Sequence, residues 1–198
     1  GRPVHSSKPH LGLNAITFAA ELLAELNRMA EDLKFERQDD RFEPPWHTLT
    51  VTQVHGGTTS NIVPGSCWIG WEIRALPNFD LAPHVKRIRD KCAALEAEMR
   101  KIHPEGAISL RQTGDVPSFG AIAGSEVVTL CQKLAERNET FAVPYGTEAG
   151  LFQMGGVPAV VCGPGDIAQA HTANEWIEVA ELDKCMGFLQ RLTAWASA

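Results

Sequence analysis

Apolar residues recur with helical spacing in two long segments of the N-terminal half. The first segment carries them at Leu13, Ile16, Ala20, Leu23, Leu26, Ala30 and Leu33. The second follows Asp80, a candidate N-cap, and carries them at Val85, Ile88, Cys92, Leu95, Met99 and Ile102. Spacings of three and four residues place such side chains on one face, so the pattern predicts two amphipathic helices.

Alternation of apolar and polar residues predicts strands between and beside these helices. Residues 48–54 and 67–73 alternate and are separated by a glycine-rich segment, which predicts antiparallel neighbours joined by a long loop. Residues 107–111 predict another short strand, and residues 1–5 resemble the tail of a strand that begins upstream. The order strand, helix, strand, strand, helix, strand is the ferredoxin-like βαββαβ pattern, with both helices on one face of the sheet.

The pattern changes after residues 114–124, which are rich in glycine, proline and serine and carry no periodicity. We therefore predict two domains, residues 1–113 and 114–198. The elements expected in the second are a helix at 125–136, a short strand at 141–143, a buried strand at 160–162 and a final helix with apolar residues from Leu182 to Leu192. Alternating strands and helices favour an α/β sheet, of which about 75 residues would be only half.

Composition narrows the class of partner. The net charge of −6 and the pI near 5.6 argue against nucleic acid or an anionic membrane surface, since both need a basic face. No apolar run approaches the ~20 residues of a membrane span. Five scattered cysteines are typical of a reduced, cytoplasmic protein. Because the chain starts at Gly1 without a methionine, it resembles a piece of a longer protein.

His171 is the strongest candidate for chemistry in the second domain. It follows the predicted strand at 160–162, and ligands of α/β sheets bind beyond the carboxyl ends of strands. Glu148 lies upstream between two glycines, and Glu175 follows closely, so a metal site or an acid–base pair is conceivable. One imidazole cannot hold a metal ion by itself. The alternative to a role in chemistry is that His171 is a loop histidine whose side chain only hydrogen-bonds a carbonyl.

Three residues of the first domain are weaker candidates. His5 stands at a strand end beside two serines, where a surface histidine is the alternative. Asn61 follows Gly-Gly-Thr-Thr-Ser, whose backbone can approach a ligand closely, although it could equally cap its own turn. Arg74 ends a strand, where its guanidinium could hold a carboxylate with two hydrogen bonds or simply pair with Glu72.

Four segments together resemble a known family. In order, they are GRPVHSSKPHLGLNAI, GGTTSNIVPGSCWIGWEIRALP, YGTEAGLFQMGG and VVCGPGDIAQAHTANEW. They are similar to the acetylornithine deacetylase branch of the dinuclear-zinc amidohydrolases, over essentially the whole chain. The resemblance implies a ferredoxin-like lid that dimerises, residues 1–113, followed by the C-terminal part of a mixed α/β zinc-hydrolase catalytic domain. It also implies a homodimer through the lid.

The resemblance implies a role for each candidate. His171 matches the last zinc ligand, and His5 matches a lid histidine that donates to the oxyanion in the partner's site. Asn61 and Arg74 match residues that hold the substrate's polar groups and carboxylate. The implied reaction is metal-dependent hydrolysis of an N-acyl amino acid, with N-acetylornithine as the expected substrate in arginine biosynthesis. Two zinc ions, or cobalt, are the implied metals.

Departures from the family leave alternatives open. Glu148 and the loop at Gly163 would line the pocket, but the HxD motif, the bridging aspartate and the paired glutamates of the family have no match in this chain. We therefore expect the chain to bind no zinc and to be inactive alone. The alternatives are a related dipeptidase, a succinyl-diamino-acid desuccinylase, or a non-catalytic dimerisation or binding module.

Overall fold

The computed structural model describes residues 1–143 and 145–198, which form two compact units. The first unit is Gly1–Ser118 and the second is Phe119–Ala198. The division lies inside the segment rich in glycine, proline and serine.

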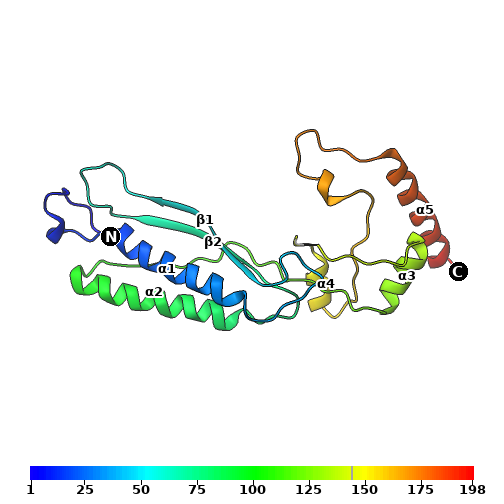
Figure 1. Ribbon diagram of the computed structural model, residues 1–198, viewed down its shortest axis with the longest axis horizontal. Helices are drawn as coiled ribbons and strands as arrows, with labels where there is room; N and C mark the ends of the chain where they lie inside the picture. Colours follow the sequence, from blue (N-terminus) through cyan, green and yellow to red (C-terminus); the bar gives the residue numbers. More distant parts are fainter. Residues whose placement is uncertain (144) are drawn as a thin grey trace. The chain divides into compact units, whose positions relative to one another are not determined.

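The first unit is a two-stranded sheet covered on one face by two long helices (Figure 1). Its helices are α1, Ala15–Leu33, and α2, Ala82–Ile102, with a short 3-10 helix, η1, at Pro9–Leu11. Its strands are β1, Thr48–Gly56, and β2, Cys67–Arg74. Both predicted helices and both central strands are confirmed, and the chain has the mixed α/β fold expected from its sequence.

The sheet has the antiparallel pairing that the alternation predicted. Thr48 lies opposite Arg74 at one end, and Gly56 lies opposite Cys67 at the other. The register shifts between Val51 and Gln53. Residues 57–66 form the connecting loop, so the loop and Arg74 stand at opposite ends of the same sheet.

The core lies between the helices and the sheet. Leu26, Met29 and Leu33 of α1 and Ile88 of α2 are fully buried. They pack with Leu49 of β1, and the partly buried side chains against them are Val51, Ile69, Trp71 and Ile73 from the strands. Full burial of one such aliphatic side chain stabilises the fold by about 1.5–3 kcal/mol.

A polar side chain just before α1 and another just before α2 accept from backbone N–H groups of the first turn. The Oδ1 atom of Asn14 accepts from the N–H groups of Ile16 and Thr17, at 2.9 and 3.3 Å. Asp80 was the predicted N-cap of α2, but the N-cap position is held by Leu81. Asp80, one residue earlier, still accepts from the N–H of Ala82 at 2.9 Å. Its side chain therefore satisfies a backbone donor at the start of α2, as an N-cap side chain does.

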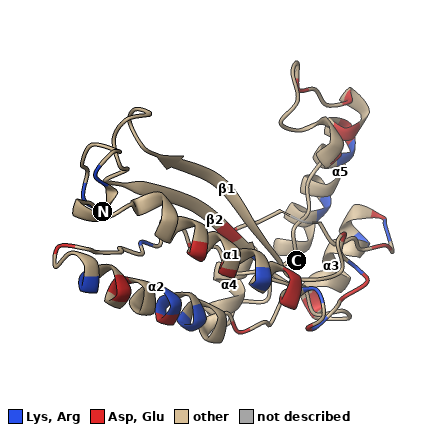
Figure 2. Ribbon diagram, turned by 60° about the vertical axis from the view of Figure 1, so that its left-hand side comes forward, with Lys and Arg blue, Asp and Glu red and all other residues tan. Residues whose placement is uncertain are grey.

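Charged residues of both signs cover the outward faces of α1 and α2 (Figure 2). Arg87 of α2 donates to Glu25 at 2.7 Å and to Asp32 at 2.6 Å, both on α1. The guanidinium groups of Arg28 and Arg87 lower the pKa of the Glu25 carboxyl below its ordinary value. Exposed ion pairs usually contribute up to about 1 kcal/mol, so these bonds supplement the apolar core.

The predictions of a first strand ending at residues 1–5 and a last strand at residues 107–111 are wrong. Arg2 and His5 make only isolated bridges, to Leu13 and Ile62. Residues 107–111 run extended and alternate in exposure, but the N–H of Ile108 bonds the carboxylate of Glu96 at 2.8 Å. Alternation fixes which way side chains point, whereas a regular strand also needs a neighbouring backbone to pair with.

The second unit holds mainly helices. They are α3, Glu126–Ala135, α4, Ala149–Met154, a 3-10 helix η2, Ile167–Gln169, and α5, Val179–Ala196. The helices α3 and α5 pack together, and the Nε atom of Arg191 donates to the carbonyl of Leu134 at 2.7 Å. The predicted helices at 125–136 and at the C-terminus are therefore confirmed.

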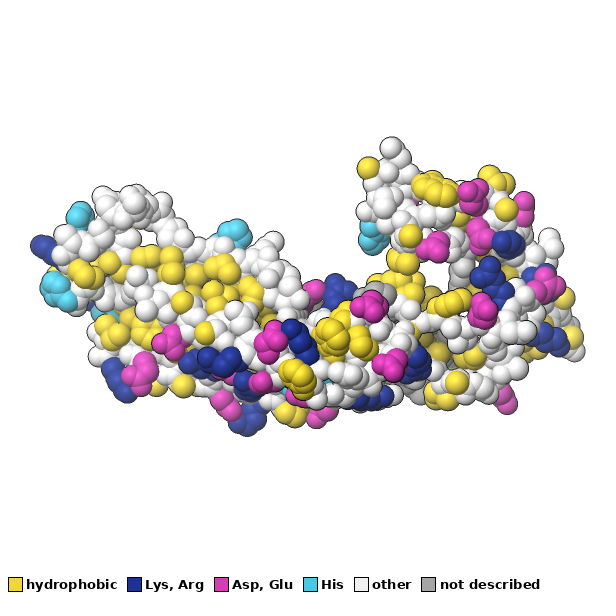
Figure 3. All heavy atoms as spheres, viewed as in Figure 1, with side chains coloured by type: hydrophobic (Ala, Val, Ile, Leu, Met, Phe, Trp, Pro, Cys, Tyr) yellow, Lys and Arg dark blue, Asp and Glu magenta, His cyan; other side chains and the backbone are white. Residues whose placement is uncertain are grey.

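The predicted strands at 141–143 and 160–162 are wrong. Neither segment forms a strand, and Val161 is half exposed rather than buried. No residue of α5 is buried either, and Leu182, Met186 and Leu189 of its apolar stripe are about half exposed. Apolar side chains are visible on the surface in Figure 3. A run of apolar residues indicates which side chains favour burial. Burial itself requires another layer of structure that packs over them, and the described residues of this unit do not supply one for these segments.

All five cysteines are free, as expected, although Cys92 alone of them is buried. None of the helices in residues 1–143 and 145–198 has the length and apolar character needed to cross a membrane.

One polar side chain, His47, is enclosed in the first unit. It is fully buried, and its ring stacks on Phe79 with the centroids 3.5 Å apart. Its Nδ1 atom accepts from the N–H of Leu76 at 2.9 Å. Burial lowers the pKa of His47, with His84 and Arg37 acting in the same direction and Glu36 opposing them.

The buried imidazole predicts a dependence of stability on pH. Because the pKa of His47 is lower in the folded state, the unfolded chain binds the proton more readily as pH falls below about 6.5. The free energy of unfolding should therefore be at its full value above that pH and fall below it. The loss is at most about 1.4 kcal/mol per pH unit.

Urea unfolding at pH 7.5 and 5.5 measures this difference. His47→Gln keeps an acceptor for Leu76 and cannot be protonated, so it should flatten the dependence. His10→Gln, at an exposed position, is the matched control and should leave the dependence unchanged. Equal dependence in the wild type and His47→Gln would show that His47 is not the group responsible.

Candidate functional site

His5 and Asn61 lie together although 55 residues separate them in the sequence. The N–H of Ser6 donates to the carbonyl of Asn61 at 2.8 Å, and His5 forms an isolated bridge with Ile62. The N-terminal segment is thereby attached to the loop between β1 and β2. The structure thus brings two of the predicted site residues to one corner of the first unit.

The side chains of this pair are held by short-range hydrogen bonds. The Nδ1 atom of His5 lies 2.7 Å from the hydroxyl of Ser7 and accepts from the N–H of Ser7 at 3.2 Å. The hydroxyl of Thr59 donates to Oδ1 of Asn61 at 3.3 Å. Both His5 and Asn61 are exposed. Their orientation is therefore constrained while their remaining polar atoms can reach a ligand.

Arg74 lies at the other end of β2. Its Nε donates to Glu72 at 2.9 Å, in an ion pair whose side chains are both about half exposed. The length of β2 separates Arg74 from the end that carries the Asn61 loop, roughly 24 Å at about 3.4 Å per residue. Within one copy of the chain, Arg74 therefore does not join the His5–Asn61 pair.

His171 occupies a tight turn of the second unit. Its φ is 58°, in the left-handed region that non-glycine residues adopt infrequently. The N–H of His171 donates to the carboxylate of Glu175 at 3.0 Å. Ahead of it, Asp166 caps η2 by accepting from the N–H of Ala168 at 2.8 Å. These bonds fix the backbone of the turn, and the imidazole itself is exposed.

Glu148 and Gly163 do not converge on His171 through any recorded bond. Glu148 is the exposed N-cap residue of α4, and its carbonyl accepts from the N–H of Leu151 at 2.9 Å. Gly163 is also exposed, and a Cβ at that position would meet no atom within 4 Å. Close packing therefore does not require glycine there. Among the described residues, neither Glu148 nor Gly163 shares a hydrogen bond or ion pair with His171.

The donor set does not fit a metal ion. In the part of the chain that the structure describes, no three histidine, cysteine, aspartate or glutamate side chains are grouped to hold one. A protein zinc site needs three or four such ligands at about 2.0–2.3 Å. His171 alone cannot meet this requirement.

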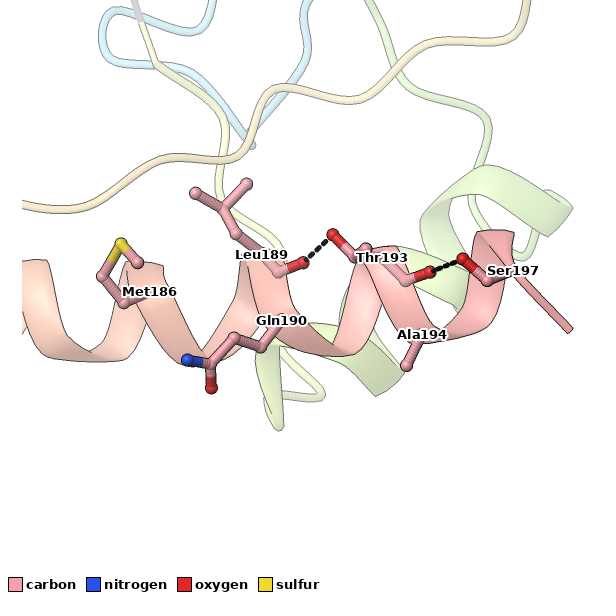
Figure 4. Close-up of a pocket in the computed structure, with 6 residues that line it drawn as sticks. All are labelled: Met186, Leu189, Gln190, Thr193, Ala194 and Ser197. Atoms are coloured by element: carbon pink, nitrogen blue, oxygen red, sulfur yellow. Dashed lines mark hydrogen bonds between the residues drawn. The ribbon is translucent and has the colours of Figure 1, made fainter.

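Two surface hollows lie away from all six predicted site residues. The larger, about 470 Å³, runs along one face of α5 (Figure 4) and is lined by Met186, Leu189, Gln190, Thr193, Ala194 and Ser197. The hydroxyls of Thr193 and Ser197 bond helix carbonyls at 2.9 and 2.8 Å, so they are satisfied within the helix. The other, about 290 Å³, lies beside α2 and includes Glu96 and Ile108.

The sequence pattern gave no separate role to Ser7 and Thr59. Both are bonded to the polar side chain two residues away, Ser7 to His5 and Thr59 to Asn61. That spacing is the only signal in the sequence, and it is common in turns.

Comparison with protein families gives two matches that together span nearly the whole chain. Residues 1–100 match the model of a peptidase dimerisation domain. Residues 107–194 match the model described as peptidase family M20/M25/M40. The first match covers the unit that holds His5, Asn61 and Arg74.

Curated relatives are similar over almost all of this chain. The acetylornithine deacetylase of Myxococcus xanthus is 31% identical over 202 residues, covering 98% of this chain and 50% of its own length. The acetylornithine deacetylase of Pasteurella multocida strain Pm70 is 31% identical, with 97% and 49% covered. The chain thus spans about half the length of the curated relatives it matches.

Solved structures are similar in fold. Aminopeptidase PepT from Bacillus cereus ATCC 10987 superposes with a TM-score of 0.68 at 24% identity, covering 95% of this chain and 47% of its own. The metallo-carboxypeptidase Sso-CP2 from Sulfolobus solfataricus gives 0.60 at 18% identity, with 95% and 54% covered.

The donor set predicts that the chain by itself does not retain zinc. After dialysis, atomic absorption should find less than stoichiometric zinc, and EDTA should leave the melting temperature unchanged. His171→Ala should change the free energy of unfolding by no more than ~1 kcal/mol, the value of about one hydrogen bond. Leu26→Ala, in the core, serves as the comparison and should lose about 2–5 kcal/mol. Stoichiometric zinc that EDTA removes would refute the prediction.

Proposed function

Because the chain belongs to the peptidase family M20/M25/M40 and carries its dimerisation domain, we propose that it is part of an amidohydrolase. The proposed reaction is hydrolysis of the amide bond of an N-acyl amino acid, with N-acetylornithine as the leading substrate. The identity of 31% to an acetylornithine deacetylase across 98% of the chain is the observation that carries this choice. Arginine biosynthesis in the cytoplasm is the corresponding setting.

His5 and Asn61 supply hydrogen-bond donors in this proposal. Attack on an amide carbonyl builds negative charge on its oxygen, and a positioned donor stabilises that charge in the transition state. His5 is exposed and held through Nδ1, which leaves Nε2 available for such an oxygen. Asn61 lies beside it and can hold a further oxygen of the substrate.

Arg74 binds the substrate's α-carboxylate in this proposal. A guanidinium can grip a carboxylate through two parallel hydrogen bonds, which here would compete with the bond to Glu72. Since the length of β2 separates Arg74 from His5 and Asn61 in one copy, one small substrate would meet Arg74 of one subunit and His5 of the other. The match to a dimerisation domain supports a homodimer with sites of this composition.

Members of this family generally use metal ions. The side chains of this chain do not fit such an ion by themselves, and we assign no step to it. His171 remains the proposed ligand that this chain would contribute, with zinc or cobalt as the metal. Glu148 and Gly163 remain proposed residues of the pocket wall.

Two alternatives follow from specific observations. The fold shared with an aminopeptidase and a metallo-carboxypeptidase makes a peptide the first alternative substrate, and a succinylated diamino acid belongs to the same group of reactions. A metal-free dimerisation or binding module is the second alternative, and the match of residues 1–100 to a dimerisation domain supports it. Assays with N-acetylornithine, a dipeptide and a succinylated diamino acid, on a protein of the relatives' full length that contains this chain, separate these possibilities.

The roles proposed for His5 and Arg74 predict different kinetic defects. In a protein of the relatives' full length that contains this chain, His5→Ala should lower kcat by ~10²–10³ with little change in KM, because an oxyanion donor acts in the transition state. Arg74→Ala should raise KM with a smaller effect on kcat, because it holds the bound substrate. Steady-state kinetics with N-acetylornithine measures both.

Lys8→Ala is the matched control for the His5 substitution. Lys8 lies in the same turn, and its backbone N–H, which bonds the carbonyl of His5 at 2.9 Å, survives the change. It should leave kcat unchanged. Small and equal effects of His5→Ala and Arg74→Ala would show that neither residue faces the substrate.

A further inference from the structure

Two cysteines of the second unit lie in contact. The thiol of Cys131, on α3, is hydrogen-bonded with the thiol of Cys162, which lies in the segment between α4 and η2. Thirty residues lie between them in the sequence, and both cysteines are free. The contact is therefore made by the fold of this unit and not by neighbouring positions along the chain.

The two thiols differ in their access to solvent. Cys162 is exposed, whereas Cys131 is partly buried. Burial, together with the hydrogen bond to Cys162, raises the pKa of the Cys131 thiol to about 11. Cys131 therefore stays protonated at neutral pH, and the thiolate is the form that reacts with oxidants. A dissolved oxidant meets Cys162 first, with the thiol of Cys131 directly beside it.

We propose that Cys131 and Cys162 are a redox-active pair, which closes to a disulfide when hydrogen peroxide oxidises Cys162. The inference goes beyond the proposed function and does not rest on it. In reducing compartments, protein disulfides are usually transient and serve catalysis or redox sensing. The pair is accordingly a site of reversible modification rather than a permanent cross-link.

The reaction takes two steps and consumes one peroxide. The thiolate sulfur of Cys162 attacks a peroxide oxygen, the O–O bond breaks, and the departing hydroxide takes up a proton to leave as water. The sulfur of Cys131 then attacks the resulting sulfenic acid, so that the S–S bond forms and the S–O bond breaks. The departing hydroxyl leaves with the proton of Cys131 as a second water. The two thiols lose two electrons, which reduce the peroxide.

The disulfide would attach the segment before η2 to α3. Residues 157–163 form no regular secondary structure, and they lead through η2 to the turn that holds His171. The helix α3 already packs against α5. A cross-link across thirty residues restricts the unfolded chain. The oxidised chain should therefore melt at a higher temperature than the reduced chain.

Oxidation of the 198-residue chain with equimolar hydrogen peroxide tests the pair. Free thiols should fall from five to three, and dithiothreitol should restore them. The mass of the intact chain should fall by about 2 Da, for the two hydrogens lost. Tryptic peptides 112–133 and 138–184 each contain one cysteine, Cys131 and Cys162 respectively. Mass spectrometry should find these two peptides linked.

Cys162→Ser is the decisive variant, because it removes the exposed thiol and retains a side chain of similar size. It should give no linked peptide, and peroxide should leave its melting temperature unchanged. Cys131→Ser should stop at the sulfenic acid of Cys162, which dimedone traps on peptide 138–184. Cys185→Ser removes another partly buried cysteine of the same unit, so it is the matched control and should keep the link.

A link that is present in the wild type and in Cys185→Ser but absent from Cys162→Ser supports the inference. Oxidation that leaves the two peptides unlinked would overturn it. A disulfide from Cys162 only to a second chain, seen as a covalent dimer on non-reducing gels, would overturn it as well.

Discussion

Burial of the inner faces of α1 and α2 against one face of the β1–β2 sheet is the interaction on which the first unit depends. Leu26, Met29, Leu33 and Ile88 are removed from water together, and Leu49 connects them to the sheet. Because these contacts fix the sheet, they also fix the loop at its end. That loop carries Asn61, and its backbone bond to Ser6 holds His5 beside it.

The sequence was sufficient to predict the helices and strands whose apolar faces are buried by other residues of this chain. The stripe ending at Leu33 and the alternation around Trp71 predicted α1 and β2, since both faces meet partners in the same unit. The prediction failed where the partner is not among the described residues. Val160 to Cys162 has the composition of a buried strand, yet Val161 is half exposed, and α5 packs against α3 but has no buried residue.

The candidate site follows the same division. Proximity of His5 and Asn61 depends on a backbone hydrogen bond across the sheet end, which residue types alone could not indicate. The specific roles given to His171, Glu148 and Gly163 came from the resemblance, and among the described residues no hydrogen bond or ion pair joins them. The bonds from Ser7 and Thr59 depend on turn geometry that a two-residue spacing only permits.

The proposed site requires two copies of the first unit, because Arg74 and the His5–Asn61 pair lie at opposite ends of β2. Each strand of the two-stranded sheet also keeps one edge outside the β1–β2 ladder, and exposed edges favour pairing with another chain. Multi-angle light scattering of the chain at micromolar concentration measures most directly whether two copies associate. We expect a molar mass about twice the 21.6 kDa of one chain. A single species of 21.6 kDa would contradict the account, because His5 of one copy could not then reach a substrate held by Arg74 of another.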